Sequence, residues 1–250
     1  MPASILLALF SLLLLTACGQ QDTQAPASDG AADAPSLQKV LDARKAEWAE
    51  GATDEVKSLY DDGIAKVAAT GVLDTMKNVG DAAPAFTLPD EGGEDVALAT
   101  LLADGPVVIV FYRGAWCPYC NLTLAAWQEQ LDTIQGLGAR FVAISPQLPD
   151  YSLKSVQDNG LAFPVLSDVG NKVADAFGIT TQVTPEIVTF WEGKIDLEKH
   201  NGDASAKLPL AATYLIDADG TILFAHAHED YRTRAEPAEV IAKLEEIAGK

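Results

Sequence analysis

The sequence is poor in cysteine, histidine and basic side chains, and each scarcity excludes a class of protein. Three cysteines in 250 residues are too few for a scaffold held together by several disulfides. The three histidines and the single Cys-x-x-Cys supply no clear set of zinc ligands, so no metal is expected. The 17 Lys and Arg against 36 Asp and Glu give a formal charge of −19, which disfavours nucleic acid as a partner.

The sequence also lacks an apolar run long enough to span a bilayer, which takes ~20 residues. The run from Ala3 to Ala17 is shorter and stands at the start of the chain, so residues 1–17 are predicted to be a signal peptide. The segment Leu15-Thr-Ala-Cys18 is similar to the bacterial lipoprotein box, in which the cysteine is lipidated. The alternative is an ordinary secretory signal that happens to contain a cysteine.

The residues after Cys18 predict a tether and a location. Residues 18–35 consist largely of Gln, Asp, Ala, Ser, Gly and Pro, a composition that buries no core and predicts a flexible linker. A lipid on Cys18 would anchor the protein to the membrane on the extracytoplasmic (periplasmic) side, in an oxidising space. Because no Asp directly follows Cys18, the outer membrane is favoured.

Two helices are predicted ahead of the main domain. Ser36 and Thr53 stand where N-caps are expected, and the second helix is predicted to end at Gly71. Together they make a helical extension of residues 36–78, which we expect to pack on the domain that follows, residues 79–250.

The main domain alternates strand and helix patterns and is predicted to be a layered α/β fold with a mixed sheet. The apolar run 106–112 is typical of a strand buried on both faces, and Ala218-Asp-Gly220 predicts a hairpin near the C-terminus. Residues 180–208 interrupt the alternation and are predicted to be an insertion. The predicted strands are 106–112, 140–145, 163–166, 212–217 and 221–225, and the predicted helices are 118–135, 151–159, 171–177 and 237–247.

Cys117 and Cys120 stand where the first buried strand gives way to a helix. Cysteines three apart on a first helical turn lie within disulfide reach, at ~5–6 Å between Cα atoms. The unpaired N–H groups of a helix N-terminus stabilise a thiolate, which is the nucleophilic form. Pro118 suits an early helical position, and Trp116 can shield the pair from water. A purely structural disulfide is the alternative, although a loop this small constrains little.

The segment Phe111-Tyr-Arg-Gly-Ala-Trp-Cys-Pro-Tyr-Cys120 resembles the peroxiredoxin-like redoxin family, the alkyl hydroperoxide reductase/thiol-specific antioxidant group. The resemblance covers roughly residues 79–248. It implies a thioredoxin-like fold, reduction of hydrogen peroxide or organic hydroperoxides by a thiol, no cofactor, and an external dithiol reductant such as a thioredoxin-like protein. The further segments that match are Val79–Leu88, Ala143–Pro146, Phe163–Asp168 and Thr213–Gly220.

The resemblance leaves the roles of the two cysteines open. On the family pattern P-x-x-x-T/S-x-x-C, Arg113 stands at the Pro, Cys117 at the Thr and Cys120 at the peroxidatic cysteine. On the thioredoxin pattern Trp-Cys-x-x-Cys, Cys117 would attack and Cys120 would resolve. Thioredoxins also carry a cis-proline just before the strand that faces the disulfide. The corresponding stretch here, Leu210-Ala-Ala-Thr213, has no proline next to the threonine, which favours peroxide reduction.

The resemblance also implies an arginine that steadies the thiolate. Arg113 lies close to the pair in sequence, and Arg232 resembles the late arginine of the family. A solvated surface arginine is the alternative for both Arg232 and Arg234. The main hypothesis is thus a Cys117–Cys120 peroxidase. The alternatives are an extracytoplasmic thiol-disulfide oxidoreductase acting on protein cysteines, and a catalytically idle binding lipoprotein.

Overall fold

The structure is a computed structural model that describes residues 36–249. The predicted signal peptide 1–17, the linker 18–35 and Cys18 lie outside the described residues. Within residues 36–249, no helix combines the length and the apolar character needed to cross a bilayer.

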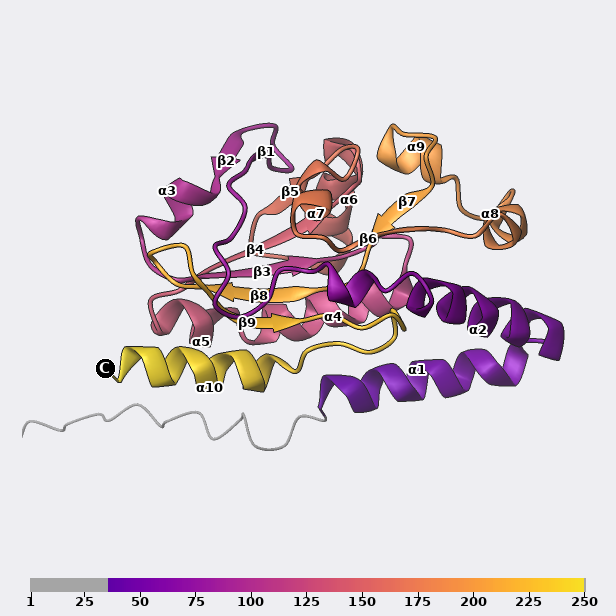
Figure 1. Ribbon diagram of the computed structural model, residues 1–250, viewed down its shortest axis with the longest axis horizontal. Helices are drawn as coiled ribbons and strands as arrows, with labels where there is room; N and C mark the ends of the chain where they lie inside the picture. The colour runs from indigo at the N-terminus through magenta and orange to yellow at the C-terminus, as the bar shows by residue number, and fades with distance from the viewer. Residues whose placement is uncertain (1–35, 250) are drawn as a thin grey trace, which may run out of the picture. The chain divides into compact units, whose positions relative to one another are not determined.

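A five-stranded mixed sheet forms the centre of the domain (Figure 1). Its spatial order is β5-β4-β3-β8-β9, with β3, β4 and β5 parallel and with β8 and β9 antiparallel to their neighbours. Every residue of β3 is buried, as the continuous apolar run predicts. The strands are β3 (Val107–Phe111), β4 (Arg140–Ser145), β5 (Val165–Ser167), β8 (Thr213–Ile216) and β9 (Ile222–His226).

Helices cover both faces of the sheet, which makes three layers. Successive residues of β3 point to opposite faces, so Val108 and Val110 join one apolar cluster while Ile109 and Phe111 join the other. The first cluster also holds residues of α4 (Pro118–Glu129), α5 (Leu131–Gly136), α10 (Pro237–Ala248) and α1 (Leu37–Gly51). The second holds residues of β1 (Thr87–Pro89), α3 (Leu98–Leu102) and α7 (Lys172–Ala176).

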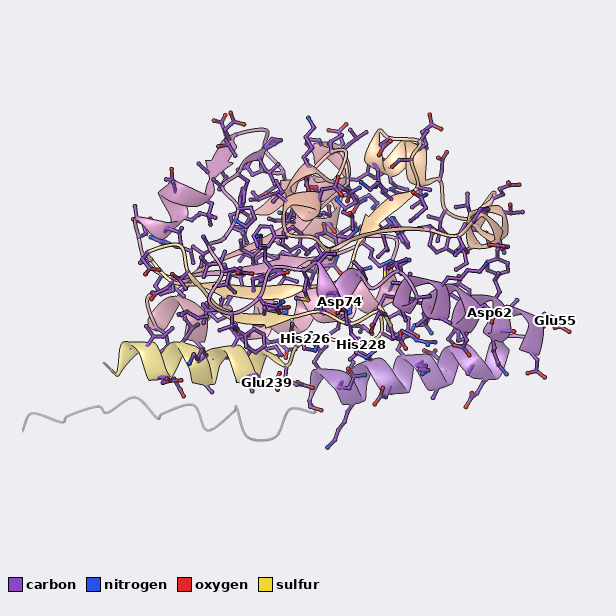
Figure 2. The ribbon with its side chains drawn as sticks, in the orientation of Figure 1. Glu55, Asp62, Asp74, His226, His228 and Glu239 are labelled. Carbon is purple, nitrogen blue, oxygen red and sulfur yellow. The ribbon has the colours of Figure 1, made fainter. Side chains whose placement is uncertain are left out.

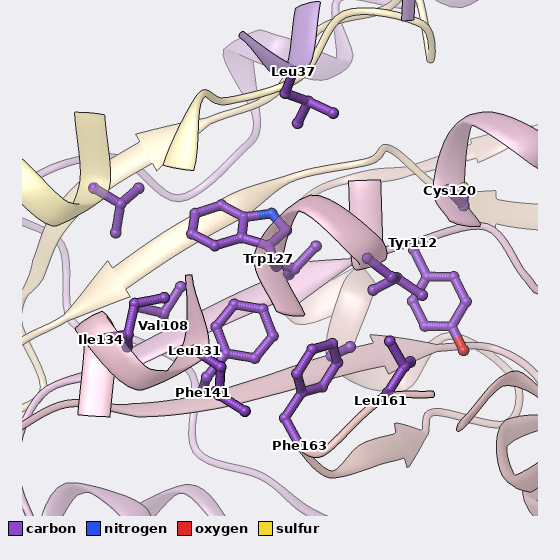
Figure 3. Packing of buried hydrophobic residues seen from close by; sticks show 14 of the residues in the cluster. Leu37, Val108, Tyr112, Cys120, Trp127, Leu131, Ile134, Phe141, Leu161 and Phe163 are labelled. Carbon is purple, nitrogen blue, oxygen red and sulfur yellow. The ribbon is translucent and has the colours of Figure 1, made fainter. Parts of the chain in front are cut away.

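The cluster beneath α4 is built around aromatic rings that pack at tilted angles (Figure 3). Trp127 lies 5.4 Å from Phe141, which lies 4.5 Å from Phe163, between ring centroids. Cys120 belongs to the same buried cluster. The start of α4 is therefore anchored by core packing as well as by backbone hydrogen bonds.

The α/β fold and the mixed sheet confirm the prediction, while several boundaries differ. The predicted helix 118–135 is two helices, because Gln130 forms a turn between α4 and α5, with φ of −100° and ψ of 0°. Several short elements were not predicted, because they carry too few residues to show a period; β1, β2 (Asp95–Ala97) and α3 are examples. Helix α6 (Pro149–Asn159) and α10 lie where predicted.

The helical extension consists of α1 (Leu37–Gly51) and α2 (Asp54–Ala68), followed by a short 3-10 turn. Thr53 caps α2 as predicted, with its hydroxyl accepting from the Val56 N–H at 3.4 Å. The prediction for Ser36 is wrong, because its side chain makes no capping hydrogen bond. α2 also ends earlier than Gly71, which instead adopts a left-handed conformation with φ of 66°.

Residues 180–208 form a small unit of their own. It contains β6 (Thr180–Gln182) and β7 (Lys207–Pro209), paired antiparallel, with α8 (Pro185–Trp191) and α9 (Leu197–Asn201) between them. The unit is joined to the helical extension, since the Trp191 indole N–H donates to the Tyr60 hydroxyl at 2.8 Å. An ion pair of 3.1 Å between Lys66 and Glu186 adds a second link.

Candidate active site

The strand-to-helix junction holds both cysteines on the first turn of α4. Cys117 is the N-cap residue, Pro118 is the first helical residue, and the Cys120 N–H donates to the Cys117 carbonyl at 3.0 Å. Both thiols are free and buried, with 2% of Cys117 and 0% of Cys120 exposed. The predicted placement of the pair at a helix N-terminus is therefore present.

The loop ahead of the pair is fixed by two side chains and a glycine. The buried Gln147 accepts from the Ala115 N–H at 2.7 Å, and the Asn121 amide donates to the Ala115 carbonyl at 2.9 Å. Gly114 has φ of +147°, and a Cβ there would lie 2.4 Å from the Trp116 indole nitrogen. Only glycine lets the Trp116 ring pack over the loop.

Arg234 faces the sulfur of Cys120. Its Nη2 lies 3.6 Å from the Cys120 Sγ, and its Nε donates to the Tyr231 carbonyl at 2.7 Å. Arg234 is 6% exposed, and its Nη1 is buried with no hydrogen-bond partner among the described residues. Since buried donors are nearly always paired, this N–H is available to an acceptor that arrives beside the thiol.

The two thiols have opposite electrostatic environments. Burial raises the pKa of Cys120, but a hydrogen bond from the Cys117 thiol and the guanidinium groups of Arg234 and Arg113 bring that pKa well below its usual value. Burial also raises the pKa of Cys117, and its S–H group is held by Cys120, so its pKa lies well above the usual value. These surroundings favour the thiolate on Cys120 and the thiol on Cys117.

Arg113 is held by aromatic rings. Its guanidinium carbon lies 4.2 Å from the ring centroid of Tyr231, 5.1 Å from that of Trp116 and 5.6 Å from that of Trp191. Cation–π attraction of this kind fixes a guanidinium without neutralising it. The positive charge of Arg113 therefore acts on both thiols and lowers the pKa of each.

The structure gives Arg232 a different place from the predicted one. Its Nε lies 2.8 Å from Asp230, and its Nη2 lies 3.3 Å from Asp61, so its charge is neutralised by carboxylates. Arg234, which was not among the predicted catalytic residues, occupies the position beside the Cys120 thiol. The signal that was available is Asp230, two residues before Arg232, which offers Arg232 an ion-pair partner.

A cavity of about 90 Å³ reaches the pair from the Cys117 side. Its walls come from the helical extension, from the insertion and from the loop that carries Tyr231. Cys120 does not line it, so Cys117 stands between the cavity and the thiolate. The lining residues are Arg44, Trp48, Tyr60, Arg113, Trp116, Cys117, Pro118, Tyr119, Trp191, Ile195 and Tyr231.

Across residues 36–249, no group of three or more His, Cys, Asp or Glu side chains is arranged to hold a metal ion. His226 and His228, labelled in Figure 2, lie at and just beyond the end of β9. The described residues thus offer no zinc site around the Cys117–Cys120 pair.

Comparison with known sequences identifies relatives for the main domain. The sequence model described as the AhpC/TSA family matches residues 79–225. A putative peroxiredoxin of Mycobacterium tuberculosis is 31% identical over 151 residues, which cover 60% of this chain and 85% of that protein. Peroxiredoxin Bcp of Escherichia coli is 29% identical over 169 residues, which cover 68% of this chain and 96% of that protein.

Solved structures give the same result for the fold. The crystal structure of peroxidoxin BcpB from Mycobacterium tuberculosis has a TM-score of 0.54 and 25% identity, and covers 68% of this chain and 97% of that chain. Peroxiredoxin Q of Xanthomonas campestris has a TM-score of 0.51 with 19% identity, covers 69% of this chain and 97% of that chain, and supports the fold alone. The fold is thioredoxin-like, as the sequence resemblance implied.

Proposed function

The chain belongs to the AhpC/TSA family and is a thiol peroxidase of the peroxiredoxin type; from that premise we propose that Cys120 attacks the hydroperoxide and Cys117 resolves the product. The observation that carries this assignment is the short approach of Arg234 Nη2 to the Cys120 Sγ, at 3.6 Å. A guanidinium there stabilises the thiolate and, through its unpaired Nη1, can bind a peroxide oxygen.

The first step is attack on the O–O bond. The Cys120 thiolate bonds to the terminal oxygen of the hydroperoxide while the O–O bond breaks, which gives a sulfenic acid and an alkoxide or hydroxide. The leaving anion takes a proton from water and departs as alcohol or water. Arg234 and Arg113 offset the negative charge that moves from sulfur to oxygen.

The second step closes a disulfide within one helical turn. The Cys117 sulfur attacks the sulfenic sulfur of Cys120, and the displaced hydroxyl leaves as water with the Cys117 proton. The pair loses two electrons in total, and the peroxide gains them. An external dithiol, for which a thioredoxin-like protein is the proposed donor, then reduces the disulfide by thiol exchange. No organic cofactor is required.

Disulfide exchange on protein cysteines is less well supported. That reaction needs Cys117, the residue nearer the cavity, to be the thiolate. The environment favours the opposite order, because the pKa of Cys117 is raised and that of Cys120 is lowered.

The assignment is tested by two single variants and a sulfenic acid trap. Cys120→Ser should abolish rapid peroxide consumption in stopped flow. Cys117→Ser should complete one turnover and accumulate sulfenic acid at position 120, which dimedone labels and mass spectrometry locates. Labelling at Cys117 in the Cys120→Ser protein, with peroxide consumption retained, would reverse the two roles.

We further propose that Cys18 is the lipidation site and that the enzyme is held on the extracytoplasmic side of the membrane. The support is the apolar run before Leu15-Thr-Ala-Cys18 and the polar segment after it. A bacterial host fed labelled palmitate should label the wild-type protein, and Cys18→Ala should lose the label. A wild-type protein that stays unlabelled would contradict the anchor.

A further inference from the structure

We propose that the helical extension, residues 36–78, positions Arg234 against Cys120 and is therefore part of the catalytic apparatus. Gln38 on α1 and Asp61 on α2 are the positioning residues. The proposal rests on the proposed function, because it concerns the arginine assigned there to the reacting sulfur. Neither the extension nor Arg234 lies within the family match, which covers residues 79–225.

The segment that carries Arg234 has no regular structure of its own. It connects β9, which ends at His226, to α10, which begins at Pro237. A loop of this kind does not hold a guanidinium within hydrogen-bond range of a sulfur unless other elements fix its backbone. The position of Arg234 therefore depends on the elements that contact the segment 230–236.

Gln38 contacts the backbone on both sides of the segment's centre. Its side-chain oxygen accepts from the Arg234 N–H at 3.4 Å, and its side-chain nitrogen donates to the Arg232 carbonyl at 3.4 Å. The same nitrogen donates to Asp42 at 2.9 Å, which orients the amide. One side chain of α1 thus holds the two peptide groups that flank Thr233.

Two carboxylates complete the attachment. Asp61 of α2 accepts from Arg232 Nη2 at 3.3 Å, while Glu236 accepts from the Leu37 and Gln38 N–H groups at 2.9 and 2.8 Å. The second interaction places a negative charge at the N-terminus of α1, where the helix dipole favours it. Both helices of the extension therefore contact the segment, on either side of Arg234.

Arg234 is one of a small set of groups that decide the charge on Cys120. The ionisable groups that face this sulfur are Cys117, Arg234 and Arg113, with Tyr112 from the end of β3. Because the attraction between guanidinium and thiolate weakens with distance, loosening the segment should raise the pKa of Cys120 while the other three groups stay in place.

The test is the ionisation of Cys120 in the full chain. The rate of iodoacetamide alkylation at Cys120 is followed against pH by mass spectrometry, so that no peroxide is needed. Gln38→Ala should raise the midpoint by about one pH unit, and Asp61→Asn should raise it by less, because Asp61 is 67% exposed. If these shifts occur in a protein that has no peroxidase activity, the proposed function is refuted, whereas the positioning role of the extension is not.

Asp62→Asn is the matched control for Asp61→Asn (Figure 2). Asp62 is the next residue of α2, is exposed, and accepts a hydrogen bond from the Ser58 hydroxyl at 3.5 Å. Removing a negative charge directly lowers a nearby thiol pKa, so the control should leave the midpoint unchanged or slightly lower. A midpoint that falls equally in both variants would refute a positioning role for Asp61.

A double-mutant cycle separates positioning from a general structural effect. If Gln38 acts through Arg234, Gln38→Ala should cause no further shift in an Arg234→Met background. The proposal is overturned if Gln38→Ala leaves the midpoint of the wild-type chain unchanged, or if its shift is as large without Arg234.

Discussion

The two sulfur atoms and the arginine that faces them are held in opposite ways. Cys117 and Cys120 are fixed inside one helical turn, by a backbone hydrogen bond of 3.0 Å between residues three apart. Arg234 is fixed by Gln38, which lies 196 residues earlier in the chain. The nucleophile is thus specified by a short stretch of sequence, whereas the charge beside it is specified by contacts between the two ends of the described chain.

The difference shows that the peroxidatic segment can be present without the site being complete. The family match includes the strand, the loop and both cysteines, and ends before Arg234. Substitutions in the strand, loop and helix that carry Cys117 and Cys120 should therefore lower both the stability and the rate of peroxide reduction. Substitutions in the contacts between the helical extension and the segment 230–236 should lower the rate of peroxide reduction more than the stability.

The largest loss of stability is expected when a side chain of the core beneath α4 is truncated. Trp127 is fully buried and packs on Phe141. Trp127→Ala should lower the free energy of unfolding by about 3–5 kcal/mol, from lost burial and the cavity left behind. Denaturant titration measures this, and Glu129→Ala on the exposed side of α4 should change it by less than about 0.5 kcal/mol. Equal effects would show that α4 is not anchored by this core.

Among the contacts between distant parts of the chain, the largest effect on activity is expected at Arg234 itself. Arg234→Met should lower kcat/KM for hydroperoxide by about 10²-fold, the usual effect of removing one charge-stabilising donor. It should also raise the pH at which kcat/KM falls, because reactivity follows the thiolate and the thiolate forms only above the Cys120 pKa. The kcat/KM of Arg234→Lys, which keeps the charge, should lie between the values for the wild type and for Arg234→Met. A pH profile of kcat/KM that stays unchanged would contradict the role of Arg234 in stabilising the Cys120 thiolate.

A smaller effect is expected at the carboxylate that joins the two ends. Glu236→Gln keeps the shape but removes the charge at the N-terminus of α1, and should destabilise the protein by about 1 kcal/mol. Faster amide exchange in α1 than in α4 would locate the loss. Glu50→Gln, an exposed change of the same charge on the same helix, is the control, and a similar loss there would point to net charge instead.

The smallest effect is expected at the exposed link between insertion and extension. Lys66 and Glu186 are 55% and 56% exposed, so solvent screens the pair. Lys66→Ala should change stability by at most about 0.5 kcal/mol, as read from thermal unfolding. A larger loss would mean that the insertion is attached through this pair and not through the hydrogen bond between Trp191 and Tyr60.

The parts of the site that follow a local pattern could be predicted from the sequence. The apolar run of β3 and Pro118 after Cys117 predicted a buried strand, a turn and a helix start, and all three are present. Thr53 was identified as a cap for the same reason, since its partner lies three residues away.

The parts that depend on distant contacts could not be predicted. Ser36 matched the residue type of a cap, but Glu236 accepts the hydrogen bonds of that helix start. Arg232 and Arg234 are two residues apart, and their roles differ because Arg232 pairs with Asp61 as well as Asp230, while Arg234 meets Cys120. Sequence periodicity carries no information about which of two neighbouring arginines meets which partner in three dimensions.

The carboxylate of Glu236 has a consequence for the order of events during synthesis. It stands immediately before α10, where its own N–H donates to Glu239 at 3.3 Å, and it also receives the first N–H groups of α1. The ribosome releases α1 well before Glu236, which lies 199 residues after Leu37, so the first N–H groups of this helix lack their acceptor until Glu236 has been made. Until that segment has emerged, the growing polypeptide can carry both cysteines without the arginine that faces Cys120.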